Sequence, residues 1–365
     1  MKILLITKTL SEKDGQGRYC LGLINEYSQN HNVTIISPDH NEALSNVTFI
    51  NAPNLNLKKD LRSFLEFRKI VRSHAKNCDV VHFCTDLPRF LIFSTIKTKP
   101  YFLTAHGTYA VSSLDHKFYK YLVRGFYKKA KKIICVSSFT QSEILKRIKL
   151  DNTVVINNGV DFEKFNKNIK EENTSDHKKN ILSVGALKNR KGFDISIKAI
   201  AKLKSKYPDL SYTIVGNQSD KNYYYHLRNI VEKSDLKDNV RFIEKVSDQE
   251  LLKLYSEADI FVLTPKVIKE NKFEGFGLVY LEAGACKIPI VASAAGGVID
   301  VVKDSQNGLV VPPDDVNATA DAIDEILSDK ALAIKLGQNG YELAKSNDWQ
   351  EVSKKYLKLY ESFTD

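Results

Sequence analysis

Short apolar runs alternate along the chain with stretches in which apolar residues recur every three to four positions. Most of the short runs are rich in Val and Ile and end at turn residues, and they predict strands. In the first half of the chain the predicted strands cover residues 2–7, 32–38, 47–53, 79–84, 101–107, 132–137 and 153–159. In the second half they cover residues 180–185, 210–216, 239–245, 259–264, 288–293 and 308–313. Helical spacing fills the intervals, so the pattern predicts parallel sheets with helices on both faces.

A polar stretch, 164–179, separates the two halves and contains almost no apolar residues. It predicts a linker between two α/β domains, one over 1–163 and one over 180–345. The remaining segment, 346–365, has the spacing of a single amphipathic helix. Because doubly wound domains bind ligands at the carboxyl ends of their strands, we expect the functional residues there.

Composition narrows the class of protein. The chain has 365 residues, of which 43% are hydrophobic and 27% charged, as in a soluble protein of two domains. The apolar run near the N-terminus is too short for a signal peptide and no later run could span a membrane, so we expect a cytoplasmic protein. The five cysteines have irregular spacing, which indicates small apolar residues in a reducing compartment. The net charge of +10 suits nucleic acid, an anionic membrane or a phosphorylated substrate, but no nucleic-acid-binding motif accompanies it.

The segment 273–297, FEGFGLVYLEAGACKIPIVASAAGG, carries the most specific chemistry. Glu282 lies in an apolar run, where a carboxylate is costly unless a partner satisfies it. Glu274 precedes a glycine-rich loop and a helix predicted over 278–287. Amides at the start of a helix bind anions, so the segment predicts a site for a ligand that carries phosphate. The alternative is an amphipathic helix with an exposed Glu282.

This segment resembles the glutamate-pair signature of the retaining glycosyltransferases of family four, which have the GT-B fold. The resemblance implies an α/β protein with two doubly wound, Rossmann-like domains that face each other across a cleft. It also implies that the C-terminal helix returns to the first domain. Glu274 would contact the donor sugar and Glu282 the ribose hydroxyls. The backbone amides that would meet the sugar and phosphate are those of Gly275, Phe276, Gly277 and Leu278.

A second candidate element is the loop SVGALKNRKG, 183–192, between a predicted strand and a predicted helix. It contains Gly185 directly after the strand and Arg190 and Lys191 before the helix, and such cations suit a diphosphate. In the resembling family the lysine at the position of Lys191 contacts the donor diphosphate. Many members carry an arginine where this chain has Ala186, so Arg190 is the candidate for that role. The alternative for both cations is a solvated basic loop.

Three further positions carry weaker signals. His106 follows a predicted strand, and family members often have a histidine there that contacts the transferred sugar. Gly15 and Gly17 follow the first strand and allow the backbone to approach a ligand closely, although a plain turn explains them equally well. Asp14 stands where the family often has a first glycine. Gly296–Gly297 predicts a tight turn, either near an acceptor or for packing.

Together these features favour a retaining transferase that moves a hexose from a nucleotide diphosphate donor, with uracil or guanine as base, to a glycan or lipid-linked hydroxyl. The chain has no Asp-x-Asp pair, so we expect no metal ion and no cofactor, with cations and amides neutralising the leaving diphosphate. Two alternatives bind the same donor: a nucleotide-sugar epimerase of the same fold and a non-catalytic nucleotide-sugar binding module. Donor incubated without acceptor distinguishes them.

A basic helix is predicted within 115–132, with aromatic residues among its cations. Its spacing places Phe118, Leu122 and Phe126 on one face, which suits an anionic membrane surface. The alternative is an amphipathic helix packed on its own sheet with a solvated basic face. The cations are Lys117, Lys120, Arg124, Lys128, Lys129, Lys131 and Lys132.

Overall fold

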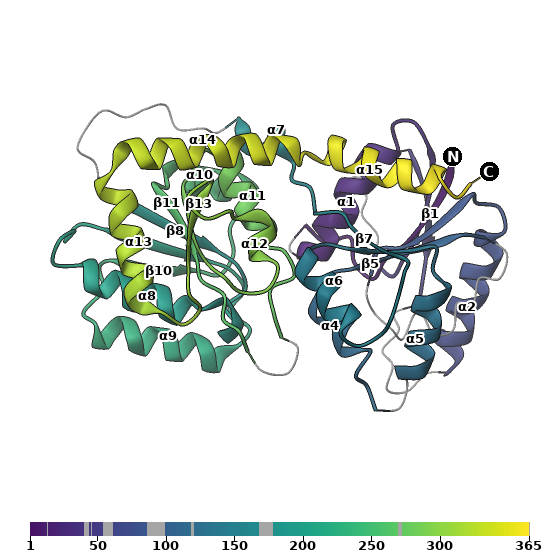
Figure 1. The fold of residues 1–365 in the computed structure, drawn as a ribbon, viewed down its shortest axis with the longest axis horizontal. Coiled ribbons are helices and arrows are strands. Elements are labelled where there is room, and N and C mark those ends of the chain that lie inside the picture. The colour runs from purple at the N-terminus through teal and green to yellow at the C-terminus, as the bar shows by residue number, and fades with distance from the viewer. Residues whose placement is uncertain are drawn as a thin grey trace. The chain divides into compact units, whose positions relative to one another are not determined.

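The computed structural model of the chain describes residues 1–12, 14–39, 44, 46–53, 61–85, 99–117, 120–167, 178–268 and 272–364. The chain forms two compact units (Figure 1). The first unit combines Met1–Gly159 with Trp349–Asp365, and the second unit is Val160–Asp348.

The first unit is built on a seven-stranded, wholly parallel sheet with the strand order β3-β2-β1-β4-β5-β6-β7. The order reverses between β1 and β4, as in a doubly wound fold. The strands are β1 (Lys2–Ile6), β2 (Asn32–Ser37), β3 (Val47–Asn51), β4 (Val80–Phe83), β5 (Tyr101–Ala105), β6 (Lys132–Cys135) and β7 (Thr153–Val155). The helices are α1 (Gly15–Tyr27), α2 (Leu61–Ala75), α4 (Thr108–Ser112), α5 (Lys120–Lys129), α6 (Ser138–Leu145) and α15 (Trp349–Glu361).

The second unit repeats this plan with a six-stranded parallel sheet in the order β10-β9-β8-β11-β12-β13. Its order reverses between β8 and β11. The strands are β8 (Asn180–Val184), β9 (Ser211–Val215), β10 (Val240–Ile243), β11 (Ile260–Leu263), β12 (Ile290–Ser293) and β13 (Gly308–Val311). The helices are α7 (Phe162–Asn166), η1 (Asn189–Lys191, a 3₁₀ turn), α8 (Phe193–Leu203), α9 (Lys221–Lys233), α10 (Asp248–Glu257), α11 (Leu278–Ala285), α12 (Val298–Val301), α13 (Val316–Ser328) and α14 (Lys330–Ser346).

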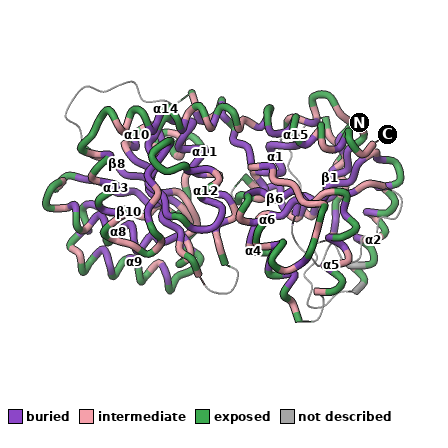
Figure 2. The backbone as a smooth tube through the Cα atoms, viewed as in Figure 1, coloured by how far each residue is buried: buried purple, intermediate pink, exposed green. Residues whose placement is uncertain are grey.

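Each predicted strand forms. The inner strands of both sheets are buried, the edge strands β3, β7 and β10 are partly exposed, and the helices alternate between buried and exposed positions (Figure 2). This is the pattern of a parallel sheet covered on both faces, so the α/β prediction is confirmed. Among the described residues, no helix has the length and apolar character to cross a bilayer. All five cysteines are buried and none forms a disulfide.

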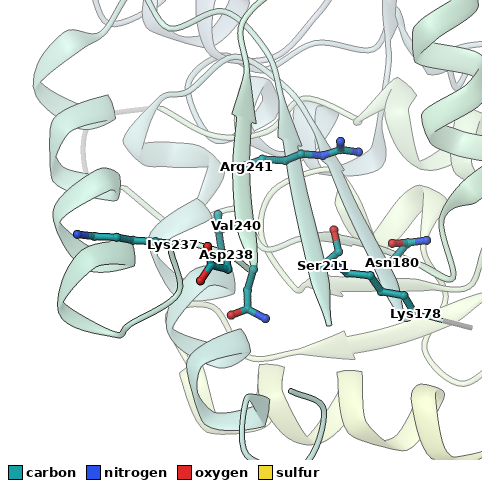
Figure 3. A pocket seen from close by; sticks show the side chains of 8 residues that line it. Lys178, Asn180, Ser211, Lys237, Asp238, Val240 and Arg241 are labelled. Atoms are coloured by element: carbon teal, nitrogen blue, oxygen red, sulfur yellow. The ribbon is translucent and has the colours of Figure 1, made fainter. Parts of the chain in front are cut away.

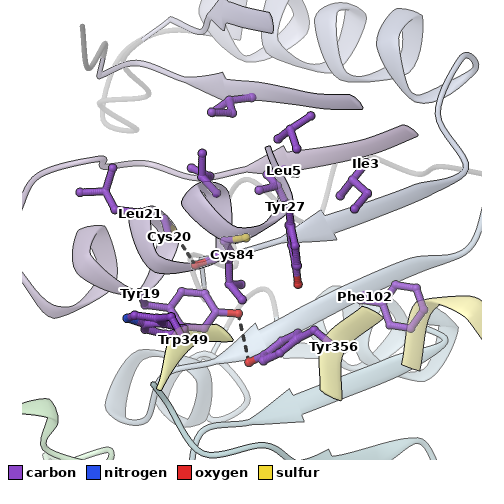
Figure 4. Packing of buried hydrophobic residues seen from close by; sticks show 14 of the residues in the cluster. Ile3, Leu5, Tyr19, Cys20, Leu21, Tyr27, Cys84, Phe102, Trp349 and Tyr356 are labelled. Atoms are coloured by element: carbon purple, nitrogen blue, oxygen red, sulfur yellow. Dashed lines mark hydrogen bonds between the residues drawn. The ribbon is translucent and has the colours of Figure 1, made fainter. Parts of the chain in front are cut away.

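The last helix, α15, belongs to the first unit and packs beside α1 (Figure 4). Its tyrosines reach a buried polar network on the sheet: the Tyr19 hydroxyl donates to that of Tyr356 at 3.2 Å, and His82 Nδ1 lies 2.6 Å from the Tyr360 hydroxyl. His82 Nε2 lies 2.8 Å from Thr104 Oγ1. Burial, and then the nearby His106, lowers the pKa of His82 to about 3. The imidazole is therefore neutral, and the network satisfies polar groups that α15 would otherwise bury unpaired.

The second unit begins earlier than the linker predicted from the sequence. Residues 160–166 belong to it because α7 packs there, with Cys286 Sγ donating to the Phe165 carbonyl at 3.4 Å. The backbone N–H of Val160 also donates to the Asn347 carbonyl at 2.9 Å. Within the predicted linker, residues 168–177 lie outside the described residues.

The predicted apolar face of the basic helix is wrong. Phe126 packs into the core, with its ring 4.7 Å from that of Tyr101, whereas Leu122 is 56% exposed. Residues four apart lie only roughly on the same side of a helix, and the buried side of this helix includes Phe126 and Val123. Phe118, the third member of the predicted face, lies outside the described residues.

Candidate donor site

The candidate site lies in the second unit at the carboxyl ends of β8 and β11, where the strand order reverses. The loop after β8 carries Arg190 and Lys191 on η1, and the loop between β11 and α11 carries Glu274. Loops at such a switch point leave opposite faces of the sheet and enclose a crevice, which is where doubly wound folds bind ligands.

The three charged side chains meet at one carboxylate oxygen. Glu274 Oε2 lies 2.6 Å from Arg190 Nη1 and 2.7 Å from Lys191 Nζ. Lys191 and Glu274 are both buried, with 7% and 9% of their surface exposed. Burial by itself would raise the pKa of Glu274, but Lys191 and then Arg190 outweigh it and lower that pKa to about 2. Glu274 is therefore ionised throughout the neutral range, and the three groups together carry one net positive charge.

Gly192 fixes the position of the two cations. It adopts the left-handed conformation, with φ at 70°, and a Cβ there would lie 1.8 Å from the Thr264 carbonyl oxygen. The loop after β8 therefore lies directly against the end of β11, because only glycine permits that approach. The Lys266 backbone N–H donates to the Arg190 carbonyl at 2.9 Å and ties the same two loops together.

The Gly296–Gly297 pair holds Glu274 from the other side. The Gly297 N–H donates to the Glu274 carbonyl at 2.8 Å. A Cβ at Gly296 would lie 2.4 Å from that carbonyl oxygen. Of the two interpretations that the sequence left open, the structure favours packing, in this case packing against a residue of the site.

A second ion-pair network, which the sequence did not predict, lies next to Arg190. Asp194, in the first turn of α8, accepts from Lys266 Nζ at 2.6 Å and from the Tyr223 hydroxyl at 2.8 Å. Lys266 Nζ also lies 3.4 Å from Asp314 Oδ1. Burial and then Asp194 raise the pKa of Tyr223, so the tyrosine stays a neutral hydrogen-bond donor. This network anchors the start of α8. It also anchors Lys266, whose backbone N–H donates to the Arg190 carbonyl.

Glu282 is buried in α11, with 3% of its surface exposed, and accepts a hydrogen bond from the Tyr255 hydroxyl at 2.8 Å. The alternative of an exposed Glu282 is therefore wrong. The Tyr255 ring packs edge-on against Phe165 and parallel to Phe261. Tyr255 could not be recognised from the sequence, because a tyrosine on the buried face of α10 is ordinary core.

The loop between the two glutamates closes onto α11. Phe276 is buried, Gly277 precedes the helix with φ at 94°, and Leu278 is the first helical residue. Gly277 has no side chain to cap the helix. The helix ends at Ala285, two residues before the predicted end, because Lys287 has a φ of 58°. On the β8 side, a Cβ at Gly185 would lie 3.5 Å from Lys191 Cε, so this glycine lies directly beside the Lys191 side chain.

The first unit holds the remaining predicted residues. His106 follows β5, and its Nε2 lies 3.0 Å from the Cys84 carbonyl oxygen at the end of β4. The His106 ring packs edge-on against Tyr19, with 4.6 Å between ring centroids. The imidazole is thus oriented by β4 and α1.

At Gly17 the structure favours the plain turn, which is one of the two interpretations that the sequence left open. The Gly17 N–H donates to Asp14 Oδ1 at 2.8 Å, because Asp14 caps the start of α1. A Cβ at Gly17 would lie 2.0 Å from the Ser11 carbonyl oxygen, so the close approach is to the chain's own loop. Gly15 is the first residue of the helix.

A cavity of about 330 Å³ lies at the opposite ends of the second unit's strands and takes no part in this site. Figure 3 shows side chains from the amino ends of β8, β9 and β10 that line it. Among the residues that the structure describes, no group of three or more His, Cys, Asp or Glu side chains could hold a metal ion.

The two doubly wound units, each with a wholly parallel sheet, define an α/β protein with two Rossmann-like domains. Residues 164–343 match the family model "Glycosyl transferases group 1", and residues 13–164 match "Glycosyltransferase Family 4". The chain therefore belongs to the group 1 glycosyltransferases, and the resemblance seen in the sequence is confirmed.

Individual proteins agree with this assignment. An uncharacterized glycosyltransferase of Methanocaldococcus jannaschii is 28% identical over 92% of this chain and 90% of its own length. A GDP-mannose-dependent phosphatidylinositol monomannoside mannosyltransferase of Mycolicibacterium smegmatis is 32% identical over 47% of this chain and 44% of its own length.

Solved structures share the fold. A glycosyltransferase from Rickettsia africae is 22% identical and has a TM-score of 0.81. The match covers 99% of this chain and 98% of the Rickettsia chain. The Anabaena protein HepE, solved with UDP and glucose, is 19% identical and has a TM-score of 0.78. The match covers 99% of this chain and 100% of the HepE chain. The chain has the GT-B fold.

Proposed function

We propose that the protein is a retaining glycosyltransferase that moves a hexose from a nucleoside diphosphate sugar to a hydroxyl of a glycan or lipid-linked acceptor. The observation that carries the proposal is the meeting of Arg190, Lys191 and Glu274 at the switch point of the second unit. Two cations and the start of α11 suit a diphosphate, and a carboxylate suits the hydroxyls of a sugar. The HepE structure with UDP and glucose is consistent with such a ligand.

In the proposed reaction, the bond between the sugar's anomeric carbon and the diphosphate oxygen breaks while a bond to the acceptor oxygen forms on the same face. The leaving diphosphate oxygen takes the acceptor's proton. The transition state has oxocarbenium character. Arg190, Lys191 and the amides of Gly275–Leu278 stabilise the charge that develops on the diphosphate, and Glu274 orients the sugar.

A panel of nucleotide sugars tests the proposal. We expect one UDP- or GDP-hexose to raise the unfolding temperature and to transfer its sugar to an acceptor with retained anomeric configuration. Donor incubated without acceptor should be hydrolysed slowly or stay intact, whereas an epimer would identify an epimerase. A donor that binds but never reacts with any acceptor would indicate a binding module.

Metal independence is a separate expectation. We expect transfer to continue in excess EDTA, because Arg190 and Lys191 supply the positive charge that a metal ion supplies in other sugar transferases. The rate is measured with and without EDTA, and then with Mn²⁺ or Mg²⁺ restored. Activity lost in EDTA and recovered with either ion would contradict this account of the diphosphate chemistry.

Glu282 is proposed to bind the ribose hydroxyls, with Tyr255 holding its carboxylate. Glu282→Ala should weaken binding of the free nucleoside diphosphate by about 10- to 100-fold, because hydrogen bonds to a charged group are strong. Tyr255→Phe should weaken it by about three- to tenfold, because the carboxylate loses the donor that orients it. Isothermal titration measures both affinities.

Tyr212→Phe is the matched control, since it removes a buried hydroxyl that lies 2.7 Å from Ser183 Oγ. This variant should lose some stability and keep its nucleotide affinity. If Glu282→Ala binds the nucleotide as the wild type does, Glu282 has another role.

A membrane surface is the proposed location of the acceptor. On α5, Tyr121 and Leu122 are exposed by 71% and 56%, and the exposed cations Lys128 and Lys129 end the same helix. Apolar side chains beside cations suit the surface of an anionic bilayer, where each cation contributes about 1 kcal/mol.

We therefore expect the protein to sediment with anionic vesicles at low salt and to bind neutral vesicles much less. The variant Tyr121→Ser with Leu122→Ser should lose roughly tenfold in partitioning, because it removes two exposed apolar groups. Tyr225→Ser is the matched control, since Tyr225 is 66% exposed on α9 of the second unit. Equal binding to anionic and neutral vesicles would rule out this surface.

A further inference from the structure

Glu274 forms ion pairs with Arg190 and Lys191, the two cations that the proposed function assigns to the donor's diphosphate. Its Oε2 pairs with both Arg190 Nη1 and Lys191 Nζ. The neighbouring carboxylate Asp194 is paired with a different cation, Lys266. Glu274 is therefore a carboxylate that pairs with both of these cations.

The arrangement has a physical reason. Lys191 is 93% buried, and a buried cation without a partner is costly. Between catalytic cycles the diphosphate is absent, so the protein must supply an anion of its own. Glu274 does so from a loop whose backbone Gly297 holds in place.

We propose that Glu274 is an internal counter-anion that competes with the diphosphate for Arg190 and Lys191. This inference rests on the proposed function and adds a second role for the same carboxylate. When the nucleoside diphosphate binds, its oxygens take over hydrogen bonds from the two cations, and Glu274 is left to face the sugar. When the product departs, Glu274 pairs with the cations again. The carboxylate thus weakens product binding and speeds its release.

The opposite possibility makes a different prediction. If Glu274 mainly keeps the two cations in a binding geometry, removing its charge should loosen them and weaken diphosphate binding. Glu274→Gln separates the two cases, because the amide keeps the shape of the side chain and loses its charge. Free nucleoside diphosphate is the right probe, since it has no sugar for Glu274 to contact.

The experiment is titration calorimetry of the full chain with UDP, GDP and inorganic pyrophosphate. We expect Glu274→Gln to bind the nucleoside diphosphate and pyrophosphate about tenfold more tightly than the wild type, which corresponds to about 1.4 kcal/mol. Sugar transfer by this variant should fall. Glu325→Gln is the matched control: it removes one negative charge from an exposed position on α13 of the same unit and should leave both affinities within twofold.

Unchanged or weaker binding by Glu274→Gln overturns the inference. If that variant does not fold, Glu274→Asp replaces it: its carboxylate is one methylene shorter, reaches the cations less well and should also tighten binding. Pyrophosphate keeps this inference distinct from the proposed function. A wild-type protein that binds neither UDP nor GDP contradicts the proposed function, and pyrophosphate affinity in the variant then decides the inference alone.

Discussion

Replacing Lys191 with alanine is expected to lower kcat/KM for sugar transfer by about 10²–10³-fold, because a charged contact to the leaving diphosphate in a buried site contributes a few kcal/mol. Lys191 is 7% exposed, and its ammonium group lies 2.7 Å from Glu274. The substitution therefore removes a cation from the diphosphate and leaves Glu274 paired with Arg190 alone. Steady-state kinetics with the donor and acceptor identified by the panel measure the effect.

Lys188→Ala is the control for this variant. Lys188 stands three residues earlier on the same loop and is exposed. Its removal makes the same change in net charge and should leave kcat/KM within about twofold, because exposed charges are screened by solvent. Near-wild-type transfer by Lys191→Ala would show that the diphosphate binds elsewhere.

The second large effect is on folding. Gly192→Ala should destabilise the second unit by about 3 kcal/mol or more, because it combines a left-handed backbone with a clash against a carbonyl group. The new Cβ would lie 1.8 Å from the Thr264 oxygen, a distance that backbone atoms relieve only by moving β11 or η1. We expect the unfolding temperature of that unit to fall by about 6–12 °C.

Gly125→Ala is the contrasting variant. Gly125 lies inside α5, and a Cβ there meets nothing within 4 Å. Alanine should stabilise that helix by about 0.5–1 kcal/mol, since glycine carries the larger entropic cost of folding. Differential scanning calorimetry compares the two variants. A Gly192→Ala protein as stable as the wild type would contradict the close packing of the two loops.

The strands and the candidate site could be predicted from the sequence, because both depend on patterns of residues that are close together in the chain. Apolar runs, most of them rich in Val and Ile, marked the strands, and Glu274, Arg190 and Lys191 stood in recognisable motifs. The ion pairs among them could not be predicted, since Arg190 and Glu274 are 84 residues apart and meet only through the order of the strands. The role of Tyr255 could not be predicted either, because its hydroxyl reaches Glu282 only when α10 packs against the core of the unit.

The two interpretations that the structure did not support have a common cause as well. Helical spacing grouped Leu122 with Phe126, but it does not say which side of the helix the sheet will cover, and the sheet covers Phe126. Glycine spacing predicted a close approach at Gly17, and that approach exists, but its partner is Ser11 of the same loop. In both cases the local pattern exists, but the residues that pack against it are set by the fold.

The polar network beneath α15 has a consequence for the order of folding during synthesis. The second unit is one continuous stretch, Val160–Asp348, so a ribosome delivers all of it before the segment that follows. The first unit begins the chain, yet the Tyr360 partner of His82 and the Tyr356 partner of Tyr19 come from residues made after the second unit. Until then the sheet of the first unit lacks the helix that covers these buried groups. Domains usually finish folding in the order in which they are made. Here the second unit is able to finish first, because the first unit gains its covering helix only when residues 349–361 emerge.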